Sequence, residues 1–353
     1  MCDFKIENND CSNINELIDL SKTYYSEGDI INKSYLEWQY LTNPSGKPFL
    51  LTSRENVSND LAGQYLVLPV KFTLADSVVN GSLSLNTLTS PKYQGKGLFT
   101  KMAKATFYEC ANENAHFTIG FPNPNSYPGF VKKLDFHHLG DIPLLIKPLR
   151  YFNLAFSFFK KRHQKHGGDI KIKTLNNNSS IKSFDFNDVT LEAKYNKFWE
   201  TIKSQYSASV NKDFAYMYWR FHSLPTREYN VFYVEEDNEI KGVIVLRAEH
   251  VWGFNVGLIM DLLILNNDTT LGKRLLKYSK KVFKHIRIDF IAALHNRTCE
   301  YSILKKYNFF TVPKKLLPQK IHFIVRLNKD FPKSEMLFKS ENWKLTFGDY
   351  DIF

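Results

Sequence analysis

The chain of 353 residues contains an internal repeat, which limits the possible folds more than any other feature. Trp38 and Trp219 each lie in an aromatic-rich segment that reaches a proline six residues later. Downstream of each tryptophan, apolar stretches typical of strands lead into an amphipathic helix and then into a further short strand. This shared order over about 130 residues in each half predicts a duplicated α/β unit, with helices and a mixed sheet in each copy.

The two copies match element by element. Strands are expected at 63–72, 82–89 and 117–121 in the first half, and at 229–235, 240–248, 256–265 and 289–294 in the second. After its last strand, each half has an asparagine followed 13 residues later by a phenylalanine, Asn123 with Phe136 and Asn296 with Phe309. We therefore expect a first domain at 1–165, a linker at 166–182 and a second domain at 183–353.

The expected linker is rich in Gly, Asn and Ser, which favours a loop. Before it, the apolar segment 151–159 is followed by the basic segment 160–166. This order favours a helix packed between the two domains, and the alternative is a peripheral contact with a membrane surface.

Composition limits the setting of the protein. The formal net charge of +11 would attract polyanions such as phosphorylated ligands, without choosing among them. No apolar stretch has the roughly 20 residues needed to span a bilayer, and no secretory signal is evident. The four cysteines form no pair at metal-ligand spacing, which is typical of a reducing, cytoplasmic environment, and no metal is expected.

A glycine-rich turn between a strand and a helix is the sharpest local signal. Gly95 and Gly97 follow the strand that ends at Thr89 and precede a helix that starts at Leu98. Glycines let the backbone turn its N–H groups into one concavity at a helix N-terminus, which favours a pyrophosphate. Lys92 and Lys96 add positive charge to its rim. In the second half, Asp268 stands at the matching turn and would repel phosphate, so that copy is expected to be degenerate.

Gln94, Gly95, Lys96 and Gly97 resemble the coenzyme A loop of the GNAT superfamily of N-acetyltransferases, Arg/Gln-x-x-Gly-x-Gly/Ala. Phe99 departs from the small residue that is usual there. The ending 134–136, Leu-Asp-Phe, is similar to the family's Lys-Leu-Gly-Phe ending. The resemblance covers residues 83–136 and, more faintly, 258–309. It implies two tandem GNAT-like domains, an acyl-CoA co-substrate and acyl transfer to an amine, with the cofactor bound by Leu88, Thr89, Gln94, Gly95, Lys96, Gly97, Leu98, Phe99, Asn123 and Ser126.

Catalytic residues are harder to assign, because the family often has a tyrosine about seven residues after the asparagine, where this chain has Phe130. The candidates for proton transfer are His116, Tyr127, His138 and, from a returning acidic C-terminal segment, Asp349. Catalysis by the substrate alone, without a protein base, stays open.

The acceptor is expected in a cleft shared by the two domains, near Trp38, Arg220 and Asp261. The tandem arrangement, the net charge and the aromatic content of 15% favour a nucleotide-linked amino sugar of surface polysaccharide biosynthesis as acceptor. One alternative is a Fem-type transferase that uses aminoacyl-tRNA, which the absence of a long helical arm disfavours; nucleic acid is therefore not expected as a partner. Another alternative is a non-catalytic GNAT-like protein that binds acyl-CoA.

Overall fold

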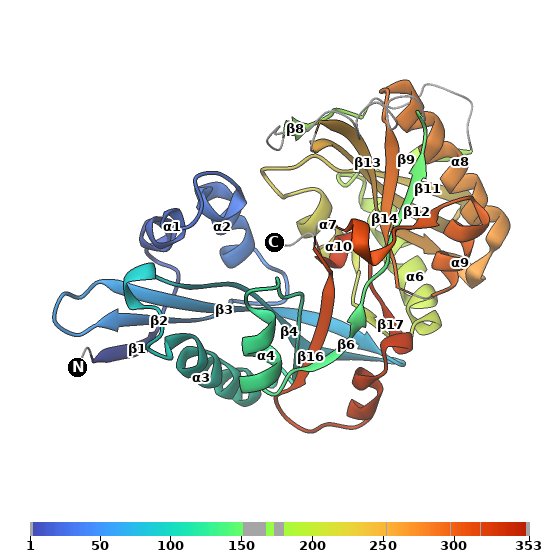
Figure 1. Ribbon diagram of the computed structural model, residues 1–353. Helices are drawn as coiled ribbons and strands as arrows, with labels where there is room; N and C mark the ends of the chain where they lie inside the picture. The colour runs from blue at the N-terminus through green and yellow to red at the C-terminus, as the bar shows by residue number, and fades with distance from the viewer. Residues whose placement is uncertain are drawn as a thin grey trace.

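The computed structural model describes residues 3–150, 167–172, 180–251, 253–296, 298–317 and 319–350. These residues form two mixed sheets with helices packed on them, arranged as two halves (Figure 1). The predicted mixed α/β class with two sheets is therefore confirmed. Among the described residues, none of the helices has the length and apolar character that a membrane span requires.

The first sheet has the strand order β1 (Phe4–Asn8), β2 (Phe49–Glu55), β3 (Leu61–Leu74), β4 (Ser77–Thr89), β5 (Phe117–Gly120), β16 (His322–Leu327) and β6 (His137–Asp141). The short strand β10 (Ala208–Val210) pairs with β3 and with β17 (Trp343–Lys344). Its helices are α1 (Ile14–Lys22), α2 (Lys33–Leu41), α3 (Leu98–Asn112) and α4 (Tyr127–Lys133).

The second sheet has the order β15 (Phe310–Thr311), β7 (Leu144–Pro148), β14 (Phe290–Leu294), β13 (Phe254–Ile264), β12 (Glu239–Val251), β11 (Asn230–Glu236) and β9 (Ile181–Ser183), and β8 (Gly167–Asp169) pairs with β12. Its helices are α6 (Val189–Ile202), α7 (Phe214–Phe221), α8 (Thr269–His285), α9 (Cys299–Lys306) and α10 (Phe347–Tyr350). Every strand expected from the repeat is present, with ends shifted by a few residues.

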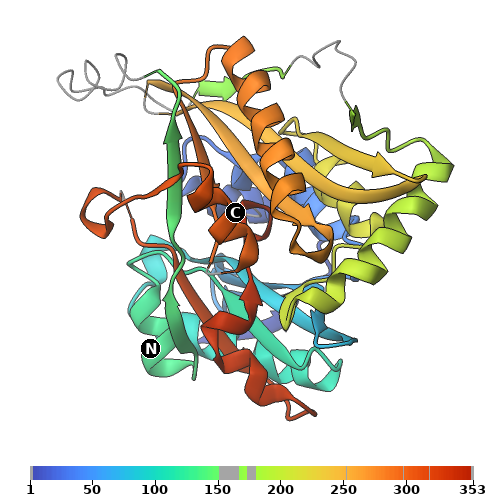
Figure 2. The same cartoon turned by 90° about the vertical axis from the view of Figure 1, so that its right-hand side faces the viewer.

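The two sheets exchange strands. β7 follows β6 in the chain but pairs with β14 of the second sheet, with Ile146 opposite Ala292. In return, β16 comes from the C-terminal part of the chain and lies between β5 and β6 of the first sheet, with Ile324 opposite Gly120. Figure 2 shows the green segment of β6 and β7 passing from the lower half to the upper one, while red β16 lies in the lower half.

This exchange means that the sheets do not follow the expected ranges 1–165 and 183–353. The boundary itself remains a prediction, because the segments 151–166 and 173–179, with the proposed apolar and basic helix, lie outside the described residues. The expected linker is not wholly loop, since residues 167–169 form β8 on the edge of β12. The exchanged strands connect the two halves through backbone hydrogen bonds. Division of the chain at a single position between the halves would break these hydrogen bonds.

Candidate functional site

The parallel strands β4 and β5 separate at one end. They pair from Ser82 opposite Thr118 to Ser84 opposite Gly120, and beyond this point β4 continues without β5 as a neighbour. The separation coincides with a bulge, because the pairing of β4 with β3 skips Asn86 and Thr87. Residues 85–89 of β4 therefore have no β5 residue as pairing partner, and a gap opens between the two strands.

Asn86 stabilises this bulge. Its φ of 49° lies in the left-handed region, which asparagine tolerates better than most residues. Its side-chain amide donates hydrogen bonds to Gln39 Oε1 at 2.7 Å and to the Tyr40 hydroxyl at 2.9 Å. Both partners lie on α2, directly after Trp38, so the repeated aromatic segment holds the strand in its bent form.

The glycine-rich turn lies at the same end of the sheet. Gly95 and Gly97 both have φ of 75°, and space is open where a side chain would stand. Gly97 caps the 15-residue helix α3 and provides no side-chain acceptor for its first N–H groups. These groups have no partner within the helix, so they are available to an anion. The geometry fits the pyrophosphate cradle expected from the sequence.

The other residues of this turn have local roles as well. Lys92 forms an ion pair with Asp60 at 2.7 Å, and the hydrogen bond to Asp60 raises the pKa of Lys92. The Gln94 amide donates to the Tyr24 hydroxyl, which in turn donates to the backbone oxygen of Thr89 at 2.5 Å. Lys96 is exposed at the rim, where it is available to a phosphate.

Phe99, the departure from the family pattern, packs against α4. Its ring lies 5.5 Å from that of Phe130, and a Cβ placed on Gly129 would stand only 3.0 Å from the ring. Gly129 thus makes room for the bulky side chain. Asn123 shapes the loop before α4, because its side-chain oxygen accepts hydrogen bonds from the backbone N–H groups of Asn125 and Ser126, both at 3.0 Å.

A cleft of about 650 Å³ opens from the separated strands toward the second half. Leu88, Asn123 and Ser126 from the predicted cofactor set line it. The opposite wall contains charged or polar residues that the sequence analysis did not select: Asp169, Arg227, Arg247, Glu249 and Tyr350. They come from β8, β12, a loop and α10, so no local spacing in the sequence could have grouped them.

Salt bridges organise the charged wall. Arg247 contacts Asp169 at 3.0 Å and Glu249 at 2.7 Å. Arg227 forms an ion pair with Asp29, which comes from the first half. With Glu27, the cleft is lined by four carboxylates and two guanidinium groups. The described lining of the cleft thus contains more carboxylates than guanidinium groups.

Two of the four catalytic candidates do not reach this cleft. His116 directly precedes β5, whereas the strands separate at the last residue of β5, about 13 Å away at 3.3 Å per residue. Burial, with a smaller effect of Lys329, lowers the pKa of His116. Asp349 is 1% exposed and forms an ion pair with Lys212 at 2.9 Å, so it is part of the interior rather than of a mobile acidic tail. Neither position fits proton transfer in the cleft.

The other two catalytic candidates lie together. The rings of Tyr127 and His138 are 5.3 Å apart, and Tyr127 also stacks on His322 at 4.3 Å. This cluster lies beside the cleft, where Ser126 directly precedes Tyr127, but Tyr127 and His138 do not line it. A catalytic role for them stays a prediction.

The three residues expected to contact the acceptor are buried instead. Trp38 is 4% exposed and packs on Trp219, and Arg220 donates to the backbone oxygen of Gly348 at 3.1 Å and to the Tyr229 hydroxyl at 2.9 Å. Asp261 is 1% exposed and pairs with Lys212 and with Lys344. Placed in this way, none of them lines the cleft, so contact with an acceptor is not supported.

The charges around Asp261 form a buried network. Burial alone would raise the pKa of Asp261, but Lys212 and Lys344 hold it well below its usual range. Burial alone would lower the pKa of Lys212, but Asp261 and Asp349 outweigh it and the pKa is raised. Asp261 and Lys212 are therefore both charged near neutral pH, and each compensates the buried charge of the other.

In the second half, residues of the same chain fill the corresponding gap. β12 and β13 have a bulge at 260–261, at the position that matches Asn86 in the repeat. Beyond it, the backbone N–H of Leu345 donates to Asn296 Oδ1 at 3.0 Å, Thr346 bridges to His295, and Lys344 binds Asp261. Asp268 caps α8 through the N–H groups of Thr270 and Leu271. The gap is thus filled by residues of the C-terminal segment, and the N-terminus of α8 is capped by Asp268. Both observations support the expected loss of cofactor binding in the second half.

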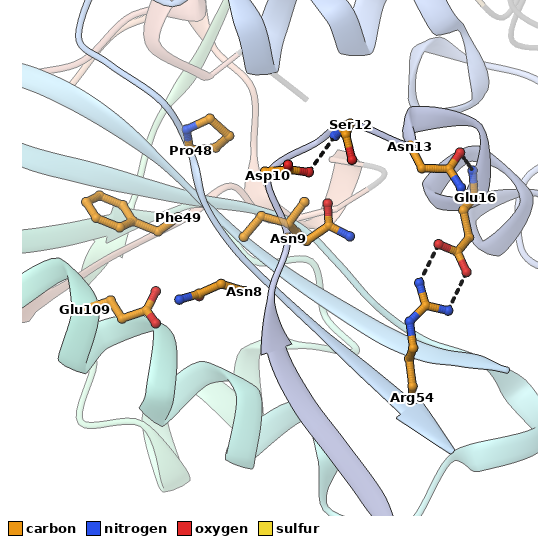
Figure 3. Close-up of a pocket in the computed structure, with 11 residues that line it drawn as sticks. Asn8, Asn9, Asp10, Ser12, Asn13, Glu16, Pro48, Phe49, Arg54 and Glu109 are labelled. Carbon is orange, nitrogen blue, oxygen red and sulfur yellow. Dashed lines mark hydrogen bonds and ion pairs between the residues drawn. The ribbon is translucent and has the colours of Figure 1, made fainter. Parts of the chain in front are cut away.

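A separate hollow of about 540 Å³ lies beside β1, β2, α1 and α3 (Figure 3). Its one arginine, Arg54, is held by both carboxylate oxygens of Glu16 at 2.5 Å and by Glu7 at 3.1 Å. The hollow lies at the β1 edge of the sheet, away from the separated strands, and brings together none of the predicted site residues.

Comparisons with known proteins agree with this geometry. Residues 13–139 match the acetyltransferase (GNAT) domain family, and this range includes the separated strands and the glycine-rich turn. A comparison with curated proteins found no match.

Solved structures show the same fold over nearly the whole chain. Saccharomyces cerevisiae N-myristoyltransferase with bound myristoyl-CoA has 13% identity and a TM-score of 0.61, over 92% of this chain and 82% of that one. A GCN5-related N-acetyltransferase from Anabaena variabilis has 13% identity and a TM-score of 0.59, over 93% and 73%. An Enterococcus faecalis protein described as a probable N-acyltransferase has 11% identity and a TM-score of 0.58, over 93% and 73%. The overall architecture resembles the tandem GNAT fold.

Proposed function

We propose that this protein is an N-acyltransferase that transfers a short acyl group, such as acetyl, from acyl-CoA to the amine of a small-molecule acceptor. The observation that carries the proposal is that three features lie together at one end of the first sheet: the gap between β4 and β5, the bulge at Asn86, and the N-terminus of α3, which has no side-chain cap. In this arrangement the pyrophosphate binds at Gly95 and Gly97 and the thioester lies in the gap.

The reaction follows from this placement. The uncharged amine attacks the thioester carbonyl, the C–N bond forms, and the C–S bond breaks with release of the thiolate. Backbone N–H groups on the open edge of β4 near Leu88 and Thr89 stabilise the negative charge on the carbonyl oxygen. The proton lost by the amine is passed to the thiolate or to a carboxylate of the cleft. Alignment of amine and thioester accounts for most of the rate, so no covalent intermediate is needed.

The nucleotide-linked amino sugar inferred from the sequence is one candidate acceptor. The cleft charges favour a second candidate, a small polyamine with more than one ammonium group. Four carboxylates against two paired guanidinium groups repel a diphosphate and attract a cation. At 4 Å and an effective dielectric constant of 20, one such pair of charges is worth up to about 4 kcal/mol, which is enough to decide between the two acceptors.

The test is thiol release from acetyl-CoA with a panel of acceptors that includes spermidine and several nucleotide-linked amino sugars. We expect higher kcat/KM for the polyamine, and a raised KM for that amine in Glu249→Gln with unchanged CoA affinity. Glu109→Gln, in the hollow of Figure 3, is the matched control and should behave as the parent protein. Turnover with amino sugar nucleotides alone would overturn the charge argument, and no turnover with any amine would overturn the enzymatic function.

A further inference from the structure

Two histidines and an aspartate from distant parts of the chain meet beside α4. Their ligand atoms all lie within 4.8 Å of one another, and this is the one such group found among the described residues. His322 Nδ1 lies 2.8 Å from Asp141 Oδ1, and His138 Nε2 lies 3.4 Å from the same oxygen. No metal site could be recognised from residue spacing, because His322 lies 181 residues after Asp141.

A bulge in β6 produces this arrangement. Residues three apart on a regular strand point to opposite faces. The pairing of β6 with β16 skips Leu139, and Gly140 takes a φ of 130°, which glycine allows. His138 and Asp141 are thereby brought to one face of the sheet, and His322 stands directly opposite Asp141 on β16. The backbone itself aims the three side chains at a common point.

The surroundings leave one side of this point open. The Tyr127 ring stacks on His322 and meets His138 edge to face. The side chains of Asp141 and His322 are 10% and 12% exposed, whereas that of His138 is 31% exposed. The ammonium group of Lys314 donates to the other Asp141 oxygen at 3.0 Å, but this lysine is 70% exposed and can withdraw when another cation binds.

We propose that His138, Asp141 and His322 bind a divalent transition-metal ion, with zinc as the best match. Imidazole nitrogen and carboxylate oxygen are ligands of Zn²⁺, with bonds of about 2.0–2.2 Å. In a tetrahedral site such donors are about 3.4 Å apart. The distance from His138 to Asp141 matches this value, whereas His322, at 2.8 Å from Asp141, must move away from that carboxylate when the ion binds. Three protein ligands leave the fourth position to water or to a small ligand.

The ion would join two neighbouring strands of the first sheet. His138 and Asp141 lie on β6, whereas His322 lies on the exchanged strand β16, which comes from the C-terminal part of the chain. A ligand that binds only the folded state shifts the equilibrium toward it, so the ion stabilises the strand exchange. The metal site is separate from the proposed acyl-transfer chemistry, and the proposal of this site does not depend on the proposed function.

Zinc binding to the full-length protein, freed of metal with a chelator, tests the proposal by isothermal titration calorimetry. We expect one saturable Zn²⁺ per chain, a rise in Tm on zinc addition, and an absorption spectrum of tetrahedral Co²⁺ when Co²⁺ is used instead. His138→Gln and His322→Gln should each weaken Zn²⁺ binding at least tenfold and abolish the Tm shift.

His137→Gln is the matched control, because His137 is exposed on the same strand and is not part of the cluster. It should bind zinc as the parent protein does. Circular dichroism verifies folding of each variant, and Asp141→Asn provides a second measurement if one histidine variant does not fold. Absence of saturable zinc binding, or equal binding by all folded variants, would overturn the proposal.

Discussion

Trp38 and Trp219 stack on each other at the junction of the two halves, with ring centroids 4.5 Å apart and planes inclined by 12°. Each indole N–H donates to the backbone oxygen of the other tryptophan, at 2.9 Å from Trp38 and 3.3 Å from Trp219. The two residues are equivalent positions of the internal repeat. The two tryptophans therefore make equivalent contacts with each other, as expected when two related units pack about an approximate twofold axis.

Loss of this contact should destabilise the whole protein. For Trp38→Ala we expect a fall in the free energy of unfolding of about 3–5 kcal/mol, because a buried indole is removed and Trp219 loses its partner. Tyr108→Ala removes an exposed aromatic ring on α3 and should change stability by less than about 0.5 kcal/mol. Urea denaturation measures both. Equal effects would mean that the tryptophan pair does not hold the halves together.

The cradle predicts a strong effect of charge at Gly97. Gly97→Asp should abolish CoA binding, because a carboxylate would face the pyrophosphate and cap α3. Gly46→Asp is the matched control: Gly46 also has a positive φ, 123°, but lies away from the cradle, so CoA affinity should be retained. Calorimetric titration with CoA measures both variants. Retained affinity in a folded Gly97→Asp protein would be incompatible with the cradle.

The corresponding change in the second copy belongs at Asp268 and not at Gly272. A Cβ on Gly272 would stand 2.8 Å from Ile264 and 2.9 Å from Ile303, so substitution there would disturb the core. Asp268→Ala should cost about 1 kcal/mol of stability through loss of the helix cap and leave CoA affinity within twofold.

The buried charge network should respond to single and paired changes in different ways. Asp261→Asn leaves Lys344 without its buried partner and should cost about 3–5 kcal/mol. The double variant Asp261→Asn with Lys344→Met should be more stable than Asp261→Asn alone, because Lys212 keeps Asp349. Chemical denaturation of the four proteins gives the coupling. Additive losses would contradict a compensating network.

His295 should make stability depend on pH. Burial, with the nearby charge of Lys344, lowers its pKa to about 4 from 6.5, so the folded state keeps it neutral. Between pH 6.5 and 4 the unfolded chain takes up a proton that the folded chain does not. Stability falls over this range by about 3 kcal/mol from this group, at about 1.4 kcal/mol per unit.

The variant His295→Gln should therefore lose less stability than the parent protein when the pH is lowered from 7 to 4.5. His285→Gln, at an exposed histidine, serves as the control and should follow the parent curve. Denaturation curves at a series of pH values provide the comparison. Parallel curves for His295→Gln and the parent would refute the buried neutral histidine.

Local features of the site could be predicted from the sequence. Gly95 and Gly97 predict the turn before α3, and the repeated tryptophan segments at Trp38 and Trp219 predict two related units. The cleft wall could not be predicted, because Asp169 and Arg247 meet through the pairing of β8 with β12, and Tyr350 reaches the cleft through the return of the C-terminal segment. The ion pairs of Asp261 could not be predicted either, because Lys212 and Lys344, which compensate its charge, are 49 and 83 residues away in the chain.

A crystal structure with acetyl-CoA tests the central claim most directly. We expect the pyrophosphate at the backbone N–H groups that follow Gly95 and Gly97, and the thioester in the gap beyond Ser84 and Gly120, facing the cleft with Arg247 and Glu249. The equivalent gap of the second half should hold only residues 343–346 of the chain. Acetyl-CoA bound elsewhere, or with its thioester outside the gap between β4 and β5, would contradict the account.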